Sequence, residues 1–98
     1  MIKAITKMAV LPDKTAEFER LAKELVCCSR KDDGSEYYSC NKSEIQPNTY
    51  CFIEFWRDAE AFHSSMKKEY FTRLFPQLVE LTEEKPVIEV YTELEDNL

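Results

Sequence analysis

The sequence predicts an α+β fold in which a four-stranded antiparallel sheet carries helices on one face. Four segments alternate apolar and polar residues with the period of a strand, and two regions repeat apolar residues with the period of a helix. These segments follow one another in the order β-α-β-β-α-β. A chain of 98 residues has room for one hydrophobic core. We therefore expect a single domain over residues 1–98, with its folded core in residues 2–94.

The first strand is predicted from Ile2 to Leu11, where apolar residues occupy the even positions. Pro12 ends this strand, and Asp13 is a good N-cap for the helix that follows. That helix carries one apolar stripe and is charged on its other side, so it should cover a sheet. The stripe consists of Phe18, Leu21, Ala22, Leu25 and Val26.

Two further strands are predicted over residues 36–42 and 50–56, joined by a hairpin loop over residues 43–48 that contains Pro47. The loop before the first of them holds Gly34, the chain's single glycine. A tight turn with positive φ would favour glycine at that place. These two strands should pair in antiparallel fashion.

The last third of the chain reads as a helical region followed by a strand. Asp58 is a predicted N-cap, and a second helical stretch runs from Tyr70 to Val79. Pro76 lies within this stretch, so we expect the helix to kink there or to restart with Pro76 in its first turn. The final strand is predicted over residues 86–94, and the acidic tail, residues 95–98, should be frayed.

This order of elements is that of the ferredoxin-like split β-α-β-β-α-β fold. Because the helices can cover only one face of the sheet, the other face would leave apolar and aromatic side chains in water. A homodimer that packs sheet against sheet would bury them.

Composition and charge exclude several classes of partner. Nineteen acidic against thirteen basic residues give a net charge of −6, and no basic cluster is denser than Lys67-Lys68. Such a field repels phosphate backbones, so we expect no nucleic-acid partner. Charged residues occur within the first seven positions, and no apolar run is long enough for a signal or a membrane span. We expect a cytoplasmic protein without membrane contact.

The four cysteines are expected to be reduced thiols, and none stands in a Cys-x-x-Cys spacing. Cys27 and Cys28 are adjacent on a helix and point in different directions, which argues against a metal site. Cys40 and Cys51 would lie nearly opposite each other if the hairpin is centred near Ile45 and Gln46, so that oxidation would be geometrically feasible. The alternative is two small, half-buried side chains in a reducing cell.

The segment 54–62, Glu-Phe-Trp-Arg-Asp-Ala-Glu-Ala-Phe, together with Tyr70-Phe71 and the segment 86–91, Pro-Val-Ile-Glu-Val-Tyr, resembles the antibiotic biosynthesis monooxygenase family of dimeric α+β barrels. The likeness extends from Ile2 to about Leu94. The resemblance implies the fold and the homodimer. It leaves the reaction open, because the family includes cofactor-independent oxygenases of phenols and quinols, haem-degrading enzymes and a sugar-phosphate isomerase.

The family's functional positions are only partly matched. Oxygenases of anthrone-like aromatics carry an Asn and a Tyr around the Trp, where this chain has Phe52 and Phe62, so only Trp56 is retained. The positions used for haem degradation hold Lys7, Ser65 and Phe75, which disfavours that activity. Many quinol-type relatives have two histidines after the Trp; here Ser65 and Tyr70 stand at those places, and the single histidine, His63, is displaced by two residues.

Three residues are candidates for catalysis: Glu54, Trp56 and His63. Glu54 and Trp56 share one strand face, so the carboxylate is either a buried base in an apolar pocket or an ion-pair partner of Lys7 or Arg57. His63 has a suitable ordinary pKa of about 6.5, although a helical His among charged residues is commonly just solvated. Trp56 would stack on a planar substrate or seal the core.

The predicted substrate pocket consists of aromatic residues that could equally be core: Phe52, Phe62, Tyr70 and Phe71. By resemblance, the leading hypothesis is a cofactor-independent monooxygenase of a small aromatic, quinol-type molecule. The alternatives are a non-catalytic dimeric module that binds a small molecule, and an isomerase of a small phosphorylated metabolite, for which Lys7, Arg57 and Arg73 are the available cations. A cavity closed by Phe52, Phe62 and Phe75 would favour the binding module.

Overall fold

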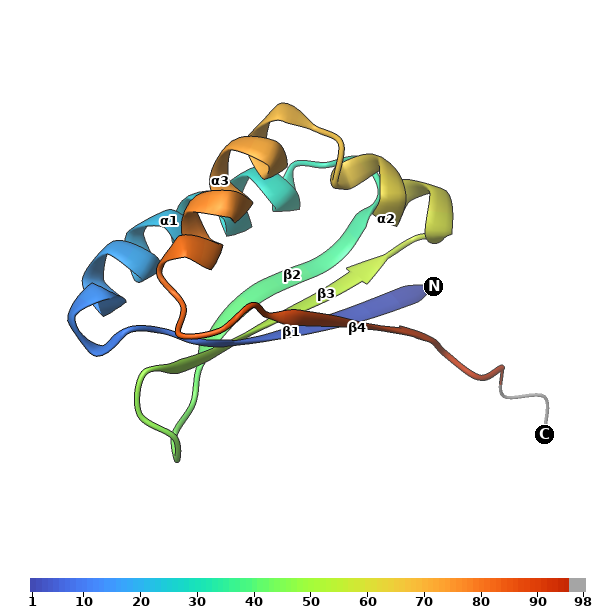
Figure 1. Cartoon of the computed structure of the whole chain (residues 1–98). Helices are drawn as coiled ribbons and strands as arrows, with labels where there is room; N and C mark the ends of the chain where they lie inside the picture. The colour runs from blue at the N-terminus through green and yellow to red at the C-terminus, as the bar shows by residue number, and fades with distance from the viewer. Residues whose placement is uncertain (96–98) are drawn as a thin grey trace.

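The computed structural model describes residues 1–95 and has two layers, with the helices lying above a twisted sheet (Figure 1). The four strands and three α-helices occur in the order expected from the sequence. A short 3-10 turn, Pro12–Lys14, precedes α1. The elements are β1 (Ile2–Ala9), α1 (Thr15–Arg30), β2 (Ser35–Lys42), β3 (Thr49–Trp56), α2 (Ala59–Ser65), α3 (Glu69–Glu80) and β4 (Val87–Thr92).

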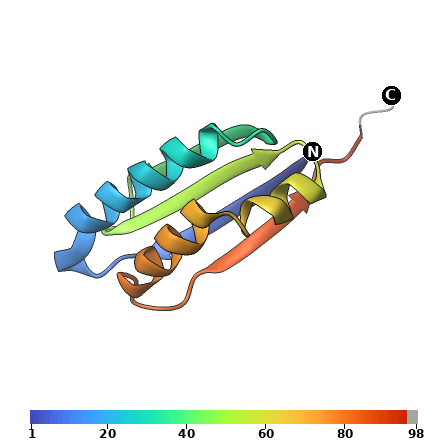
Figure 2. The same ribbon diagram turned by 90° about the horizontal axis from the view of Figure 1, so that it is seen from above.

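The sheet has the strand order β2-β3-β1-β4, and each neighbouring pair is antiparallel. All three helices lie on one face, with α1 running beside the helical segment α2-α3 (Figure 2). This arrangement confirms the α+β, ferredoxin-like fold. Among the described residues, no helix is both long enough and apolar enough to cross a membrane.

The core lies between the two layers and is built from even-numbered strand residues. Ala4 pairs with Glu54, and Thr6 pairs with Phe52, so the side chains of β1 and β3 alternate in step. Phe18 and Leu25 of α1 and Leu74 and Leu78 of α3 are completely buried against this face. The helical stripes expected from the sequence are therefore the ones that pack on the sheet.

The opposite face of the sheet is uncovered and largely apolar. Ile5, Ile53 and Phe55 are only partly buried there. Tyr37 lies beside Phe55, with ring centroids 5.1 Å apart, and 46% of its surface remains exposed. We call Ile5, Tyr37, Ile53 and Phe55 the open face. Isolated soluble domains seldom leave such a contiguous patch in water.

The observed register corrects the expectation for the two hairpin cysteines. Cys40 pairs with Phe52, and Cys51 pairs with Asn41. The two cysteines are therefore one residue out of register, and a shift of one residue places their side chains on opposite faces of the sheet. The loop is centred on Gln46 and not midway between Ile45 and Gln46, and a disulfide between the two cysteines is excluded by this geometry.

Gly34 is needed for a different reason from the one predicted. No glycine of the described residues has positive φ; the positive value belongs to Asn48, at 55°. A Cβ atom built on Gly34 would lie 2.3 Å from Cβ of Ala61. Glycine at this place lets the loop after α1 approach α2, so close packing and not backbone conformation selects it.

One of the two predicted helix N-caps is present in the structure, and the other is not. The carboxylate of Asp58 accepts a hydrogen bond from the amide of Ala61, at 2.8 Å, and starts α2 as predicted. Asp13 makes no such cap because it lies inside the 3-10 turn, and α1 begins after Lys14 without a side-chain cap. Pro76 lies within α3, which runs through it and does not restart.

The C-terminal strand is shorter than predicted, ending at Thr92 instead of Leu94. The first strand likewise ends at Ala9, with Val10 forming only an isolated bridge to Thr82. The expectation of a frayed tail concerns residues 95–98, of which 96–98 lie outside the described residues.

Candidate functional site

The candidate site is centred on Glu54, a carboxylate buried in the core. Glu54 lies on β3, between Ala4 of β1 and Tyr38 of β2, and its side chain points towards the helices. Only 9% of the residue is exposed. Glutamate is seldom buried to this extent without a cationic partner, so its presence here calls for a specific interaction or function.

That interaction comes from Trp56, two residues further along the same strand. Its indole Nε1 donates a hydrogen bond to Oε1 of Glu54, at 2.7 Å. Residues at positions i and i+2 of a strand share a face, so the local backbone alone brings the two side chains together. Trp56 is 1% exposed, and this hydrogen bond satisfies its single donor.

Burial raises the pKa of the Glu54 carboxyl, because desolvation disfavours its charged form. The hydrogen bonds from Trp56 and from the Tyr38 hydroxyl act in the opposite direction but do not cancel the effect of burial. Arg57 pairs instead with Asp33 and Asp58, and Lys7 lies on the other face of the sheet, opposite Cys51. Of the alternatives drawn from the sequence, the buried, weakly acidic carboxyl is the one that the structure contains.

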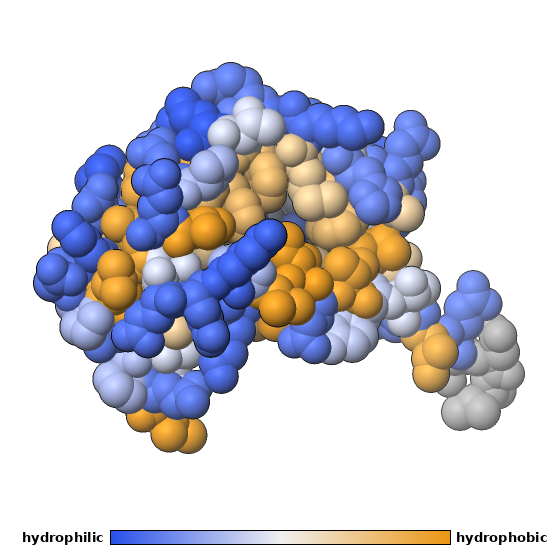
Figure 3. Space-filling model, in the orientation of Figure 1, coloured by the Kyte–Doolittle hydropathy of each residue, from blue (hydrophilic) through white to orange (hydrophobic). Residues whose placement is uncertain are grey.

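A small apolar cavity lies next to Glu54. Figure 3 shows apolar side chains gathered around a hollow between the helical layer and β4. The cavity measures about 10 Å³, enough for roughly one water molecule. Its walls come from all four strands and from the segment of α2 and α3. They consist of Thr6, Tyr38, Phe52, Glu54, Phe62, Met66, Phe71, Phe75 and Ile88.

The predicted pocket residues separate into two groups. Phe52, Phe62 and Phe71 line the cavity. Tyr70 does not: its hydroxyl donates to Oδ2 of Asp32, at 2.9 Å, and ties the start of α3 to the loop after α1. Burial, together with this carboxylate, raises the pKa of Tyr70. Tyr70 is half-buried and packs at the edge of the core, outside the cavity lining.

His63 is separate from Glu54 and from the cavity. It is exposed on α2, and its ring packs against that of Phe62, with centroids 5.3 Å apart. Phe62 faces inward, and its neighbour in sequence must face elsewhere on a helix of 3.6 residues per turn. The structure thus brings Glu54 and Trp56 together and leaves His63 in solvent.

Sequence reasoning missed several residues of the cavity wall. Thr6 and Ile88 pair with each other across β1 and β4, and Thr6 also pairs with Phe52. Their even positions in the strand pattern would have placed them on the helix-covered face, but only the register shows that they meet beside Glu54. Met66 follows the end of α2, outside the regular stripe. Within residues 1–95, no three His, Cys, Asp or Glu side chains are grouped so that they could hold a metal ion.

The fold and the buried site define a two-layer ferredoxin-like domain with an aromatic cavity between its layers. The family model for antibiotic biosynthesis monooxygenases matches residues 1–85. This chain belongs to that family.

Solved structures share this fold, and a curated relative is similar in sequence. A conserved protein from Methanosarcina mazei is 26% identical and superposes with a TM-score of 0.92, over 95% of this chain and 92% of that one. An antibiotic biosynthesis monooxygenase is 24% identical, with a TM-score of 0.91, over 97% and 100% of the two chains. An uncharacterised protein of Synechocystis is 29% identical over 82 residues, which are 84% of this chain and 56% of the relative. The chain thus spans little more than half the length of that relative.

Proposed function

We propose that this protein is a cofactor-independent monooxygenase of a small aromatic, quinol-type substrate, with Glu54 as the proton acceptor. Membership of the monooxygenase family supports the reaction class. The observation that carries the assignment of Glu54 is a carboxylate without an ion-pair partner among the described residues, at the wall of an aromatic cavity. A carboxyl with a raised pKa in a water-poor site is suited to general base catalysis.

The chemistry starts with the substrate's own acidity. The Glu54 carboxylate takes a proton from the phenol or from the carbon acid beside the ring, and the resulting anion reduces dioxygen and forms a carbon–oxygen bond. Cleavage of the oxygen–oxygen bond follows, with the proton returned by Glu54. For a methylene centre, one oxygen atom of dioxygen becomes the carbonyl oxygen of the product, and the other leaves as water with the two methylene hydrogens. The apolar walls would keep bulk water from the intermediate anion.

Trp56 acts in this scheme by holding the base. Its indole N–H donates to one carboxylate oxygen, which fixes the direction of the carboxyl; the substrate would compete with the Tyr38 hydroxyl for the remaining lone pairs. The face of the ring also contributes to the apolar surroundings of the site. His63 is a second candidate base only if a larger substrate reaches the exposed surface of α2, so its removal should have little effect.

The closed walls of the cavity speak against catalysis in this conformation and so favour a second candidate function, a non-catalytic dimeric module that opens to bind a small molecule. A cavity of about 10 Å³, walled by Phe52, Phe62 and Phe75, has no room for an aromatic ring in this conformation. Entry of a ligand requires displacement of the partly exposed wall residues Met66, Phe71, Phe75 and Ile88. The isomerase alternative lacks this support, since Arg73 pairs with Glu24 and Glu69, and Arg57 pairs with Asp33 and Asp58, outside the cavity.

The active unit in this proposal is a homodimer joined through the open face. Ile5, Ile53, Phe55 and Tyr37 supply an apolar centre, and the ion pair between Lys3 and Glu93 lies at its rim. A two-fold pairing of identical sheets buries the same patch twice. Family membership supports the same assembly.

Oxygen uptake by the purified protein, with a panel of quinols and anthrone-like phenols, tests the proposal. Turnover without added cofactor should fall by about 100-fold or more in Glu54→Gln, which keeps the shape of the side chain but cannot accept the proton. His63→Ala serves as the matched control and should stay within roughly twofold of the wild type. Uptake no faster than the spontaneous background for every substrate, combined with saturable quenching of the single Trp56 by the same compounds, would support the binding module instead.

A further inference from the structure

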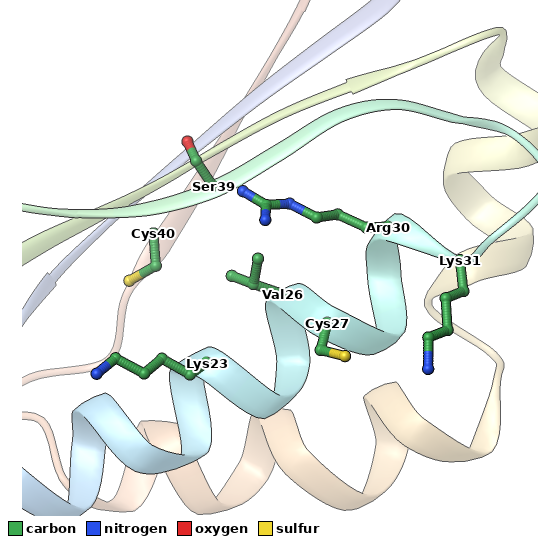
Figure 4. Close-up of a pocket in the computed structure, with 7 residues that line it drawn as sticks. All are labelled: Lys23, Val26, Cys27, Arg30, Lys31, Ser39 and Cys40. Atoms are coloured by element: carbon green, nitrogen blue, oxygen red, sulfur yellow. The ribbon is translucent and has the colours of Figure 1, made fainter.

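A second concave site lies on the other side of the molecule, between α1 and the edge strand β2. Its volume is about 560 Å³, within the range of small-molecule sites and far above that of the cavity beside Glu54. Figure 4 shows its walls: one side comes from the C-terminal half of α1, and the other from β2. We call this site the α1/β2 groove. It is lined by Lys23, Val26, Cys27, Arg30, Lys31, Ser39 and Cys40.

The charge of the groove is opposite to that of the protein. Lys23, Arg30 and Lys31 are cationic, and no acidic side chain belongs to the lining, whereas the whole chain carries a net charge of −6. Within residues 1–95, none of these three side chains takes part in an ion pair. Three free cations around one concavity form a local attraction for an anion.

Arg30 is held in place for such a role. Its Nε donates a hydrogen bond to the backbone carbonyl of Tyr38, at 2.9 Å, so the guanidinium is fixed against the outer edge of β2. Figure 4 shows it reaching across the groove towards Ser39. The two terminal nitrogens remain available, and a fixed guanidinium fork matches the oxygens of a carboxylate or phosphate.

Stabilisation of the helix does not account for all three cations. Arg30 and Lys31 lie at the C-terminal end of α1, where positive charge offsets the helix dipole. Lys23 lies about two turns earlier, beyond the reach of that effect. The four-residue spacing of Lys23, Cys27 and Lys31 places all three on one side of the helix, at the outer rim of the groove, while Val26 and Arg30 point towards β2 (Figure 4).

The remaining lining gives the site an apolar part. Val26 and the thiols of Cys27 and Cys40 offer contact surface, whereas the hydroxyl of Ser39 points away from α1 and accepts a hydrogen bond from Asn41 (Figure 4). Arg30 occupies the carbonyl of Tyr38 on the strand edge, which hinders the addition of an extended peptide there. A compact ligand therefore suits the groove better than a strand.

We propose that the α1/β2 groove binds a small organic anion, a carboxylate or a phosphate monoester attached to an apolar body. The charged group lies on Arg30, which reaches across the groove between Lys23 and Lys31, and these two lysines at its ends add to the attraction (Figure 4). The apolar body lies on Val26 and the neighbouring thiols. The site is independent of the cavity beside Glu54, and it stands whether or not that cavity is catalytic.

Amide chemical shifts of the 15N-labelled protein, titrated with phenyl phosphate and with benzoate, test this site and distinguish the two anionic groups. Saturable shifts should be centred on the amides of Val26, Cys27, Ser39 and Cys40. Neutral benzyl alcohol and inorganic phosphate should each bind more weakly, because each lacks one half of the recognised chemistry. The double variant Lys23→Gln/Lys31→Gln should weaken binding of phenyl phosphate by roughly tenfold.

The matched control is Lys14→Gln/Lys67→Gln, which removes the same charge from two exposed positions outside the groove. It should leave the affinity unchanged within roughly twofold. Equal weakening by the two double variants, shifts that do not saturate, or inorganic phosphate binding as tightly as phenyl phosphate would overturn the proposal. Shifts of the α1 amides of Val26 and Cys27 on dilution of the protein alone would also overturn it, since these amides lie away from the open face and a second copy of the chain would then occupy the groove.

Discussion

The indole N–H of Trp56 donates to the buried carboxyl of Glu54, and these two side chains come from neighbouring positions on the same face of β3. The hydrogen bond satisfies the indole but does not neutralise the carboxyl, which has no cationic partner among residues 1–95. Ionised Glu54 is therefore a weak point of the folded core. The pH dependence of stability follows from this relationship.

Glu54→Gln should stabilise the fold at neutral pH. Burial holds the pKa of Glu54 above its ordinary value of 4.5 in the folded state, so the folded protein binds this proton more tightly than the unfolded chain does. The contribution of Glu54 is fully present below pH 4.5 and is lost as the pH rises through the folded pKa. The stability gained by the variant should therefore grow as the pH rises through that window and level off above it. The total gain is about 1.4 kcal/mol for each pH unit by which the folded pKa of Glu54 exceeds its ordinary value.

Urea unfolding at pH values from 4 to 8 measures this gain. Glu44→Gln removes the same charge from an exposed loop position and should show no such growth with pH. A constant difference between Glu54→Gln and the wild type over the whole range would contradict a raised pKa.

Trp56→Phe should raise the pKa of Glu54 further. Phenylalanine keeps an aromatic ring in the core but has no N–H, so the ionised carboxylate loses a donor that now lowers its pKa. The variant should also lose about 1 to 3 kcal/mol of stability through the smaller ring and the lost hydrogen bond. The carboxyl 13C shift of Glu54 followed through a pH titration gives the pKa directly. An unchanged or lower value would show that the indole does not stabilise the charged form.

Gly34→Ala should destabilise the protein by about 1 to 3 kcal/mol, because the added methyl group would meet Cβ of Ala61. The partner change, Ala61→Gly, opens the space but costs about 1 kcal/mol within a helix. Thermal unfolding of the two single variants and the double variant completes a cycle. The double variant should be more stable than the sum of the single effects predicts. If the two single effects on stability simply add, the loss in Gly34→Ala comes from the backbone at residue 34 and not from the contact with Ala61.

Sequence patterns were sufficient to predict the helices and strands and their order, since each helix or strand depends on residues close together in the chain. The alternation in β3 and the cap at Asp58 are examples of such local information. The prediction that Gly34 serves a turn with positive φ was wrong, because glycine is required there by the contact with Ala61, which lies on a later helix. The register between Cys40 and Cys51 depended on where the loop turns, and a one-residue error reversed the conclusion.

The candidate site shows the same division. The pairing of Glu54 with Trp56 could be anticipated because a strand places residues i and i+2 together. The hydrogen bond from Tyr70 to Asp32 could not be anticipated, since the two residues lie 38 positions apart in sequence. The size of the cavity could not be anticipated either, because it depends on how closely Phe71, Phe75 and Ile88 pack over it.

Asp32→Asn should destabilise the protein at neutral pH and have less effect in acid. Although burial raises the pKa of the Asp32 carboxyl, the hydrogen bonds from Lys68 and Tyr70 outweigh it and lower the pKa below 3.8. The stabilisation by Asp32 is thus present above pH 3.8 and is lost as the pH falls through the folded pKa. We expect a loss of about 1 to 3 kcal/mol at pH 7. Asp13→Asn, an exposed acid, is the control in urea unfolding at pH 3 and pH 7.

Ile53→Glu should separate the proposed homodimer into monomers. Ile53 lies on β3 between the neighbouring strand residues Ile5 and Ser39, near the middle of the open face. In a sheet-to-sheet dimer, two-fold symmetry would bury two added carboxylates without partners, at a cost of several kcal/mol each. Analytical ultracentrifugation over a hundredfold range of protein concentration should show a dimer for the wild type and a monomer for the variant. Glu44→Gln, outside the open face, should remain dimeric. A wild-type chain that stays monomeric at every concentration would exclude the dimer, while a dimeric Ile53→Glu would place the contact elsewhere on the surface.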